Sequence, residues 1–135
     1  MLFFGIDMKV ANGKTTGFIG ENRIYIGRAN SYYDLPESPL HNPFKMSGNG
    51  ESEREKVCSF FHKYLYHKIL KWSQTGELDE TTSALRDICL KLVAGEEIIL
   101  TCWCKPYQCH GDNIIRAAEW IIKQDWFKSA YSEYF

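Results

Sequence analysis

Hydrophobic residues along the chain follow two different spacings, and each spacing predicts a different kind of element. Apolar positions three and four residues apart recur over residues 51–72 and 79–93, a spacing typical of helices with one buried face. Residues 23–26 and 98–103 are short β-rich apolar runs, which favour buried strands. A last helical pattern begins at about Gly111 and reaches about Gln124. The chain therefore mixes helices with strands.

The first part of the chain has the pattern of a hairpin. Residues 2–10 are rich in β-forming side chains, and Asn12-Gly13 is a strong signal for a two-residue turn. Residues 15–19 could form the return strand. We therefore expect residues 1–22 to form an antiparallel hairpin.

The order of the predicted elements favours an α/β fold. Two helices separate the strands at 23–26 and 98–103, so a parallel pairing between them needs a crossover, which is almost always right-handed. We expect a small three-layer fold with a mainly parallel sheet, helices on both faces and the N-terminal hairpin as an antiparallel addition. Both parallel strands would then end at the same edge of the sheet.

A long segment without periodicity follows the strand at 23–26. Residues 29–50 hold three of the four prolines, and loops of this length are uncommon in compact domains and often functional. The loop starts at the sheet edge where the strand at 98–103 also ends. A ligand pocket at the carboxyl ends of the strands is therefore expected.

Composition narrows the classes of protein and of partner. The 135 residues fit a single domain, and a net charge of −1 argues against broad binding to nucleic acid or to an anionic membrane. No apolar run is long enough to span a bilayer, and no signal peptide is visible. The 5 cysteines, an odd number, suggest reduced thiols and a cytoplasmic location. The aromatic tail at 125–135 is expected to pack on the domain or on a partner, which is compatible with a homo-oligomer.

A cluster of soft and basic side chains follows the strand at 98–103. Cys102, Cys104, Cys109 and His110 could hold zinc, although zinc ligands more often begin as Cys-x2-Cys. Alternatively, a helix N-terminus, Lys105 and His110 would lower the pKa of Cys104 or Cys109 and make a reactive thiol. In a third interpretation the cysteines are small core residues beside a ligand pocket. We expect no stoichiometric metal and no cofactor.

Other polar residues near the predicted pocket have two interpretations each. Arg28 follows a strand directly and is either an exposed surface residue or an anion ligand. Asn42 either stabilises its own loop or contacts a polar edge of a ligand. Asp112 either complements the helix dipole or acts as a general acid or base. Gly111, at the start of that helix, offers backbone N–H groups to an anion.

Four sequence blocks together resemble DUF4326, a family of uncharacterised prokaryotic and phage domains. The blocks are YIGR at 25–28, SPLHNPF at 38–44, a Glu-Arg-Glu helix start at 53–55 and TCWCKPYQCHGD at 101–112. The resemblance covers about residues 23–122. The segment before the last helix is also similar to DUF488 domains, and this similarity implies a Rossmann-like fold.

The resemblance implies a set of functional positions. The family more often has glycine where this chain has His41, so His41 is expected to narrow or polarise the pocket. A nucleotide or nucleoside derivative is the implied ligand. Arg28 and His110 are expected to be exposed pocket residues, so Arg28→Ala and His110→Ala should weaken its binding with little loss of stability. The alternatives are a sequestering protein without turnover and a zinc-stabilised interaction module. The expected catalytic residues are Cys109, His110 and Asp112, and the expected ligand-binding residues are Arg28, Asn42, Arg54, Cys104 and Gly111.

Overall fold

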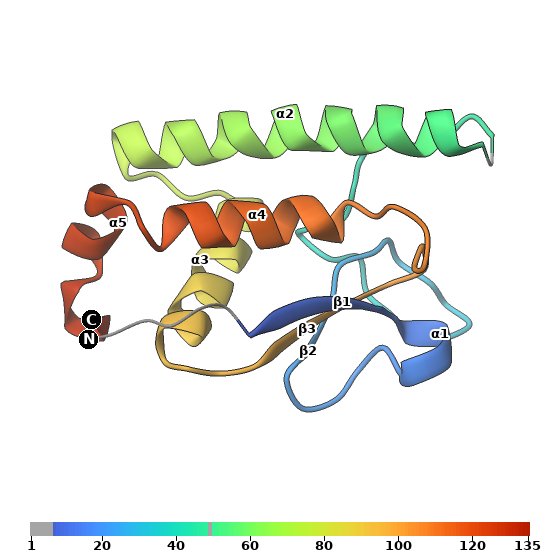
Figure 1. Ribbon diagram of the computed structural model, residues 1–135, viewed down its shortest axis with the longest axis horizontal. Coiled ribbons are helices and arrows are strands. Elements are labelled where there is room, and N and C mark those ends of the chain that lie inside the picture. Colours follow the sequence, from blue (N-terminus) through green and yellow to red (C-terminus); the bar gives the residue numbers. More distant parts are fainter. Residues whose placement is uncertain (1–6, 49) are drawn as a thin grey trace.

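The computed structural model, which describes residues 7–48 and 50–135, contains a small parallel sheet (Figure 1). Its 3 strands are β1 (Met8–Asn12), β2 (Arg23–Tyr25) and β3 (Ile98–Cys102), in the order β1-β3-β2. Both outer strands are parallel to β3, with Asn12 opposite Cys102 and Tyr25 opposite Thr101. The predicted parallel pairing of the second and last strands is confirmed, and the 3 strands end at one edge.

The predicted N-terminal hairpin is wrong over the described residues. After β1 the chain forms a short helix, α1 (Gly13–Thr16), and no return strand follows at 15–19. The Asn12 side chain accepts a hydrogen bond from the Lys14 N–H at 2.9 Å and so caps this helix. β1 pairs instead with the central strand, whose residues are all buried, and so it covers one edge of that strand. Residues 1–6 of the expected hairpin lie outside the described residues.

The long helices follow the predicted patterns closely. α2 (Glu51–Thr75) ends at Gly76, which has a left-handed φ of 76°. α3 (Glu80–Val93) begins with a reciprocal cap between Asp79 and Thr82. α4 (Gly111–Ile121) is shorter than expected and is followed by α5 (Asp125–Ala130) and the 3-10 helix η1 (Ser132–Tyr134).

The helices gather on one face of the sheet. α3 and α4 both contact β3 and also contact each other, and α2 packs across them, farther from the sheet (Figure 1). Their apolar side chains form one core with Ile98, Leu100 and Cys102. The opposite face carries a smaller cluster of Phe18, Tyr25, Leu35 and the partly buried Trp103.

Helices on both faces were expected, and within residues 7–48 and 50–135 this prediction is wrong. The α/β class is correct. Loop residues such as Phe18 cover the second face of the sheet. The Thr101 hydroxyl donates a hydrogen bond to the Phe18 carbonyl at 2.9 Å and so holds this loop against β3. No helix in the described parts of the chain is both long and apolar enough to cross a membrane.

Candidate functional site

A pocket of about 530 Å³ lies at the carboxyl ends of β2 and β3. Its lining comes from the end of β2, the proline-rich loop, the first turns of α2 and the segment between β3 and α4. The sequence singled out three of these segments, and the structure brings them together. Most of the predicted site residues line this one pocket, namely Arg28, Asn42, Arg54, Cys104, Cys109 and His110.

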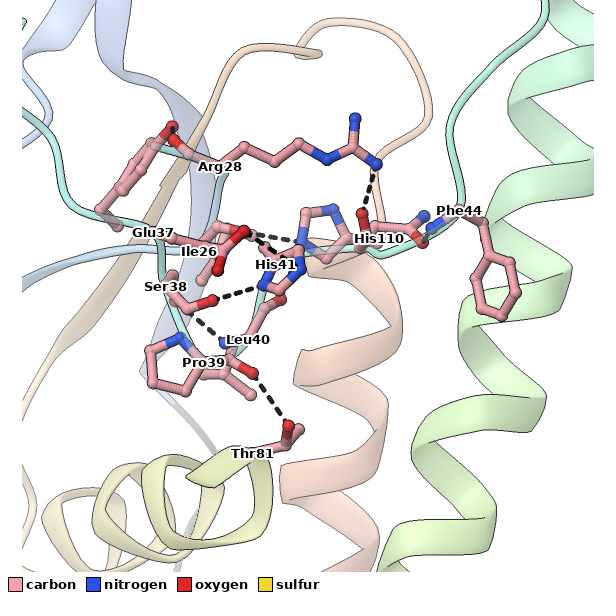
Figure 2. A network of polar contacts seen from close by, with 12 residues as sticks. Ile26, Arg28, Glu37, Ser38, Pro39, Leu40, His41, Phe44, Thr81 and His110 are labelled. Atoms are coloured by element: carbon pink, nitrogen blue, oxygen red, sulfur yellow. Dashed lines mark hydrogen bonds and ion pairs between the residues drawn. The ribbon is translucent and has the colours of Figure 1, made fainter. Parts of the chain in front are cut away.

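His110 joins the segments that form the pocket. Its Nε2 lies 2.8 Å from the carbonyl oxygen of Ile26 and 3.1 Å from that of Leu40, as Figure 2 shows for Ile26. Carbonyl oxygens only accept hydrogen bonds, so Nε2 carries the proton and donates to both. His110 therefore fastens the start of α4 to the end of β2 and to the proline-rich loop.

The same bonds fix the state of the imidazole. Burial lowers the pKa of His110, so the ring is neutral at neutral pH, with a free lone pair on Nδ1. Nδ1 faces the Cys109 sulfur at 3.8 Å. Only 8% of His110 is exposed, and the ring packs edge-on against Phe61. The expectation that His110 is an exposed pocket residue is wrong, because its polar atoms bind the protein itself.

Cysteine is concentrated in this pocket. Cys58, Cys102, Cys104 and Cys109 all line it, and all are free thiols. Hydrogen bonds from Cys104 and Cys109 lower the pKa of Cys102. The same contacts and burial raise the pKa values of Cys104 and Cys109. The pKa values of Cys104 and Cys109 are therefore raised, which is opposite to the direction expected from the sequence.

A zinc site is one of the interpretations of Cys102, Cys104, Cys109 and His110. No group of three or more His, Cys, Asp or Glu in residues 7–48 and 50–135 is arranged to hold a metal ion.

Positive charge surrounds the pocket. Arg28, Lys45 and Arg54 line it, and none of the described lining residues is Asp or Glu. The Arg28 Nη2 donates to the Asn42 carbonyl at 2.6 Å (the dashed line from Arg28 in Figure 2), which leaves its other N–H groups available. The Arg54 guanidinium lies over the Tyr107 ring, 4.7 Å from its centroid. The arrangement suits an anionic ligand.

A chain of hydrogen bonds holds Arg28 in place. The Trp103 indole N–H donates to the Tyr25 hydroxyl at 2.8 Å, and this hydroxyl donates to the Arg28 carbonyl at 2.6 Å. Gly27 makes the second bond feasible, because a Cβ at this position would lie 2.4 Å from the Tyr25 oxygen. Burial raises the pKa of Tyr25, so the hydroxyl keeps its proton.

Asn42 and His41 have structural roles. The Asn42 amide donates to the Val57 carbonyl at 3.1 Å and accepts from the Phe44 N–H at 2.9 Å, so it holds the loop to α2. The His41 Nδ1 donates to the Ser38 carbonyl at 2.7 Å (Figure 2). His41 is absent from the lining described for this pocket, and its effect on the polarity of the pocket stays a prediction.

Gly111 and Asp112 also lie outside the described lining. The Gly111 N–H donates to the Cys109 sulfur at 3.4 Å and so is not directed at a ligand. The Asp112 carboxylate accepts from the Lys105 ammonium at 3.0 Å and so steadies the segment before α4. A catalytic role for Asp112 stays a prediction.

The sequence did not predict two residues that hold the walls of the pocket in place. The Asn12 amide donates to the Lys105 carbonyl at 2.8 Å and holds the segment after β3. It was interpreted as part of a turn. The Asn113 amide donates to the Cys58 carbonyl at 2.9 Å and joins α4 to α2. A polar residue on the buried face of a predicted helix was the available signal for Asn113.

Comparison with known proteins gives one match. The model of a family described as a domain of unknown function, DUF4326, matches residues 10–120. The match begins within β1, earlier than residue 23, where the motif blocks placed the start of the resemblance. No curated protein and no solved structure matches the chain.

Proposed function

Because the chain belongs to the DUF4326 family, a domain of unknown function, we propose its function from the pocket itself: it binds an anionic small molecule of the nucleotide type. The observation that carries the proposal is charge. Arg28, Lys45 and Arg54 line the pocket, with no carboxylate among the described lining residues, although the net charge of the chain is −1. A local excess of cations without counter-charges favours a phosphate or a carboxylate.

The size and the apolar part of the pocket support a ligand with a ring. A volume of about 530 Å³ lies within the usual range for small-molecule sites. Phe44 and Trp103 add aromatic surface to the lining. A nucleoside monophosphate combines a planar base that can lie against such side chains with a phosphate for the arginines.

The proposal concerns binding and assigns no reaction step. Both His110 ring nitrogens face groups of the protein, and contacts with Cys102 and Cys104 raise the pKa of the Cys109 thiol next to it. A sequestering protein without turnover needs only the pocket and its cations. Product analysis after incubation with a bound nucleotide separates binding from catalysis.

The test is isothermal titration calorimetry with AMP, GMP, CMP and UMP, each paired with its nucleoside. We expect at least one monophosphate to bind more than about tenfold tighter than its nucleoside, because a charge-assisted hydrogen bond contributes about 1.5–3 kcal/mol. Arg28→Gln and Arg54→Gln should each weaken this monophosphate by roughly 10- to 100-fold.

Arg86→Gln is the matched control, because Arg86 pairs with Asp87 on α3 and is absent from the pocket lining. It should bind the nucleotide like the unchanged protein. Equal binding of nucleosides and monophosphates, or no binding of any of them, would overturn the proposal.

A further inference from the structure

The cations of the pocket lack carboxylate partners in the part of the chain that the structure describes. Arg28, Lys45 and Arg54 line the pocket, and the ion pairs of the described residues involve none of them. The Glu53 carboxylate, which follows the same loop, accepts from the Ser47 hydroxyl at 2.8 Å and is absent from the described lining. The pocket therefore presents three positive charges to a ligand.

Asn42 joins the segments that carry these charges. Its carbonyl accepts from the Arg28 Nη2 at 2.6 Å, and its amide donates to the Val57 carbonyl of α2 at 3.1 Å. Arg54 lies three residues before Val57 and so occupies the same face of the helix. Lys45 follows Asn42 by three residues in the loop. The three cations are therefore held around one space by hydrogen bonds of the protein.

The three cations differ in depth and in geometry. Arg28 and Arg54 are half-buried, whereas Lys45 is exposed. A guanidinium binds a phosphate through two parallel N–H groups, and an ammonium acts as a compact point charge. A phosphate monoester carries about 1.5 to 2 negative charges at neutral pH. A nucleoside monophosphate between the two arginines would therefore leave Lys45, at the mouth of the pocket, without a counter-charge.

We propose that the ligand of this pocket is a nucleoside diphosphate, with its inner phosphate between Arg28 and Arg54 and its outer phosphate at Lys45. The inference rests on the proposed nucleotide binding and names the ligand class of the same site. A diphosphate carries about three negative charges at neutral pH, which match the three cations. A triphosphate carries about one more and meets no further cation among the described lining residues.

The test is isothermal titration calorimetry in a buffer with EDTA, so that no divalent cation neutralises the phosphates. The ligands are adenosine, guanosine, cytidine and uridine, their mono-, di- and triphosphates, and inorganic pyrophosphate. For at least one base, the diphosphate should bind at least about fivefold tighter than the monophosphate, because it gains an ion pair. The triphosphate should gain less than about fivefold over the diphosphate, since its last phosphate stays in solvent.

Pyrophosphate separates recognition of the two phosphates from recognition of the whole nucleotide. It carries the same pair of phosphates without the base that lies against Phe44 and Trp103. It should therefore bind at least about fivefold weaker than the preferred nucleoside diphosphate.

Two lysine variants test the position of the outer phosphate. Lys45→Gln should reduce the gain of the diphosphate over the monophosphate to about twofold or less and leave monophosphate binding within about twofold, since Lys45 contacts only the outer phosphate. Its exposed side chain makes loss of folding unlikely to accompany the change. Lys56→Gln is the matched control. The Lys56 ammonium lies 6.0 Å from the centroid of the Phe60 ring, and Lys56 is absent from the described lining.

The outcomes distinguish this inference from the proposed function. Monophosphates that bind tighter than nucleosides, with less than a fivefold further gain for the diphosphates, would overturn the inference and leave the proposed function standing. Equal binding of nucleosides and all their phosphates would overturn both. A triphosphate gain of about fivefold or more, pyrophosphate that binds as tightly as the diphosphate, or a full diphosphate gain in Lys45→Gln would also overturn the inference.

Discussion

Several polar side chains of this pocket bond to other parts of the protein, although the sequence predicted that they would bind a ligand. The His110 Nε2 donates to the carbonyls of Ile26 and Leu40, and the Asn42 amide bonds to α2. Arg28 differs from both, because one donor of its guanidinium holds the loop and the remaining donors are available. Substitution of His110 or Asn42 should therefore lower the stability of the protein, whereas substitution of Arg28 should mainly weaken ligand binding.

The first prediction compares His110→Ala with Arg28→Ala. His110→Ala leaves two buried carbonyls without their donor, so the free energy of unfolding should fall by about 1–3 kcal/mol. Arg28→Ala removes one partly exposed hydrogen bond and should cost about 1 kcal/mol or less. Urea denaturation followed by circular dichroism measures both. Equal losses in the two variants would contradict the structural role of His110.

The second prediction concerns pH. Burial lowers the pKa of His110 in the folded protein below its usual value of 6.5. As the pH falls below about 6.5, the unfolded chain therefore takes up a proton at this residue before the folded protein does, and the free energy of unfolding should decrease between pH 7 and pH 5. Thermal unfolding across this range should show the decrease, and His110→Gln should reduce it. His62→Gln, on an exposed position of α2, should leave it unchanged.

At the scale of elements, the pocket depends on how closely α4 approaches the sheet. A Cβ at Gly111 would lie 2.8 Å from the Val10 Cγ2 and 2.9 Å from the Ile26 Cδ1. Real Cβ atoms do not come this close, so only glycine lets the helix start against the ends of β1 and β2. This approach is also what brings His110 within reach of Ile26.

The third prediction is that Gly111→Ala destabilises the protein by about 1–3 kcal/mol through overpacking. The sign of this change in stability is informative. Alanine is the better helix former by about 1 kcal/mol, so it would stabilise α4 if there were space for its Cβ. Gly48→Ala is the control, since within residues 7–48 and 50–135 no atom beyond its chain neighbours lies within 4 Å of a Cβ there. A gain in melting temperature for Gly111→Ala would show that α4 is not packed so tightly.

At the scale of the whole molecule, the C-terminal segment closes the core at the end opposite to the pocket. Phe127 of α5 is fully buried and contacts Trp72, Trp126, Tyr131 and Phe135. The aromatic tail therefore packs on the domain, which is one of the two outcomes expected from the sequence.

The fourth prediction is that Phe127→Ala lowers the free energy of unfolding by about 3–5 kcal/mol, as for other buried phenylalanines. Phe135→Ala should cost about 1 kcal/mol, because 38% of Phe135 is exposed. Guanidinium unfolding monitored by tryptophan fluorescence compares the two. Similar losses in both variants would mean that the tail contributes as a unit, without an anchor at Phe127.

The sequence alone determined the main helices, the parallel pairing of β2 with β3 and the meeting of the loop after β2 with the cysteine segment. These features depend on hydrophobic period, which is local, and on the geometry of a parallel crossover, which leaves few alternatives. The family could also be recognised from the sequence, because each of its motif blocks is an unbroken stretch of residues.

Only the tertiary structure decided which strand β1 pairs with, on which face the helices lie and which polar groups His110 contacts. Asn12-Gly13 fits a hairpin turn as well as a helix start, and the pairing of β1 with β3 selects between them. The state of His110 depends on the atoms that surround it in the fold. Ile26 and Leu40, whose carbonyls accept its hydrogen bonds, carry no chemical signal in the sequence.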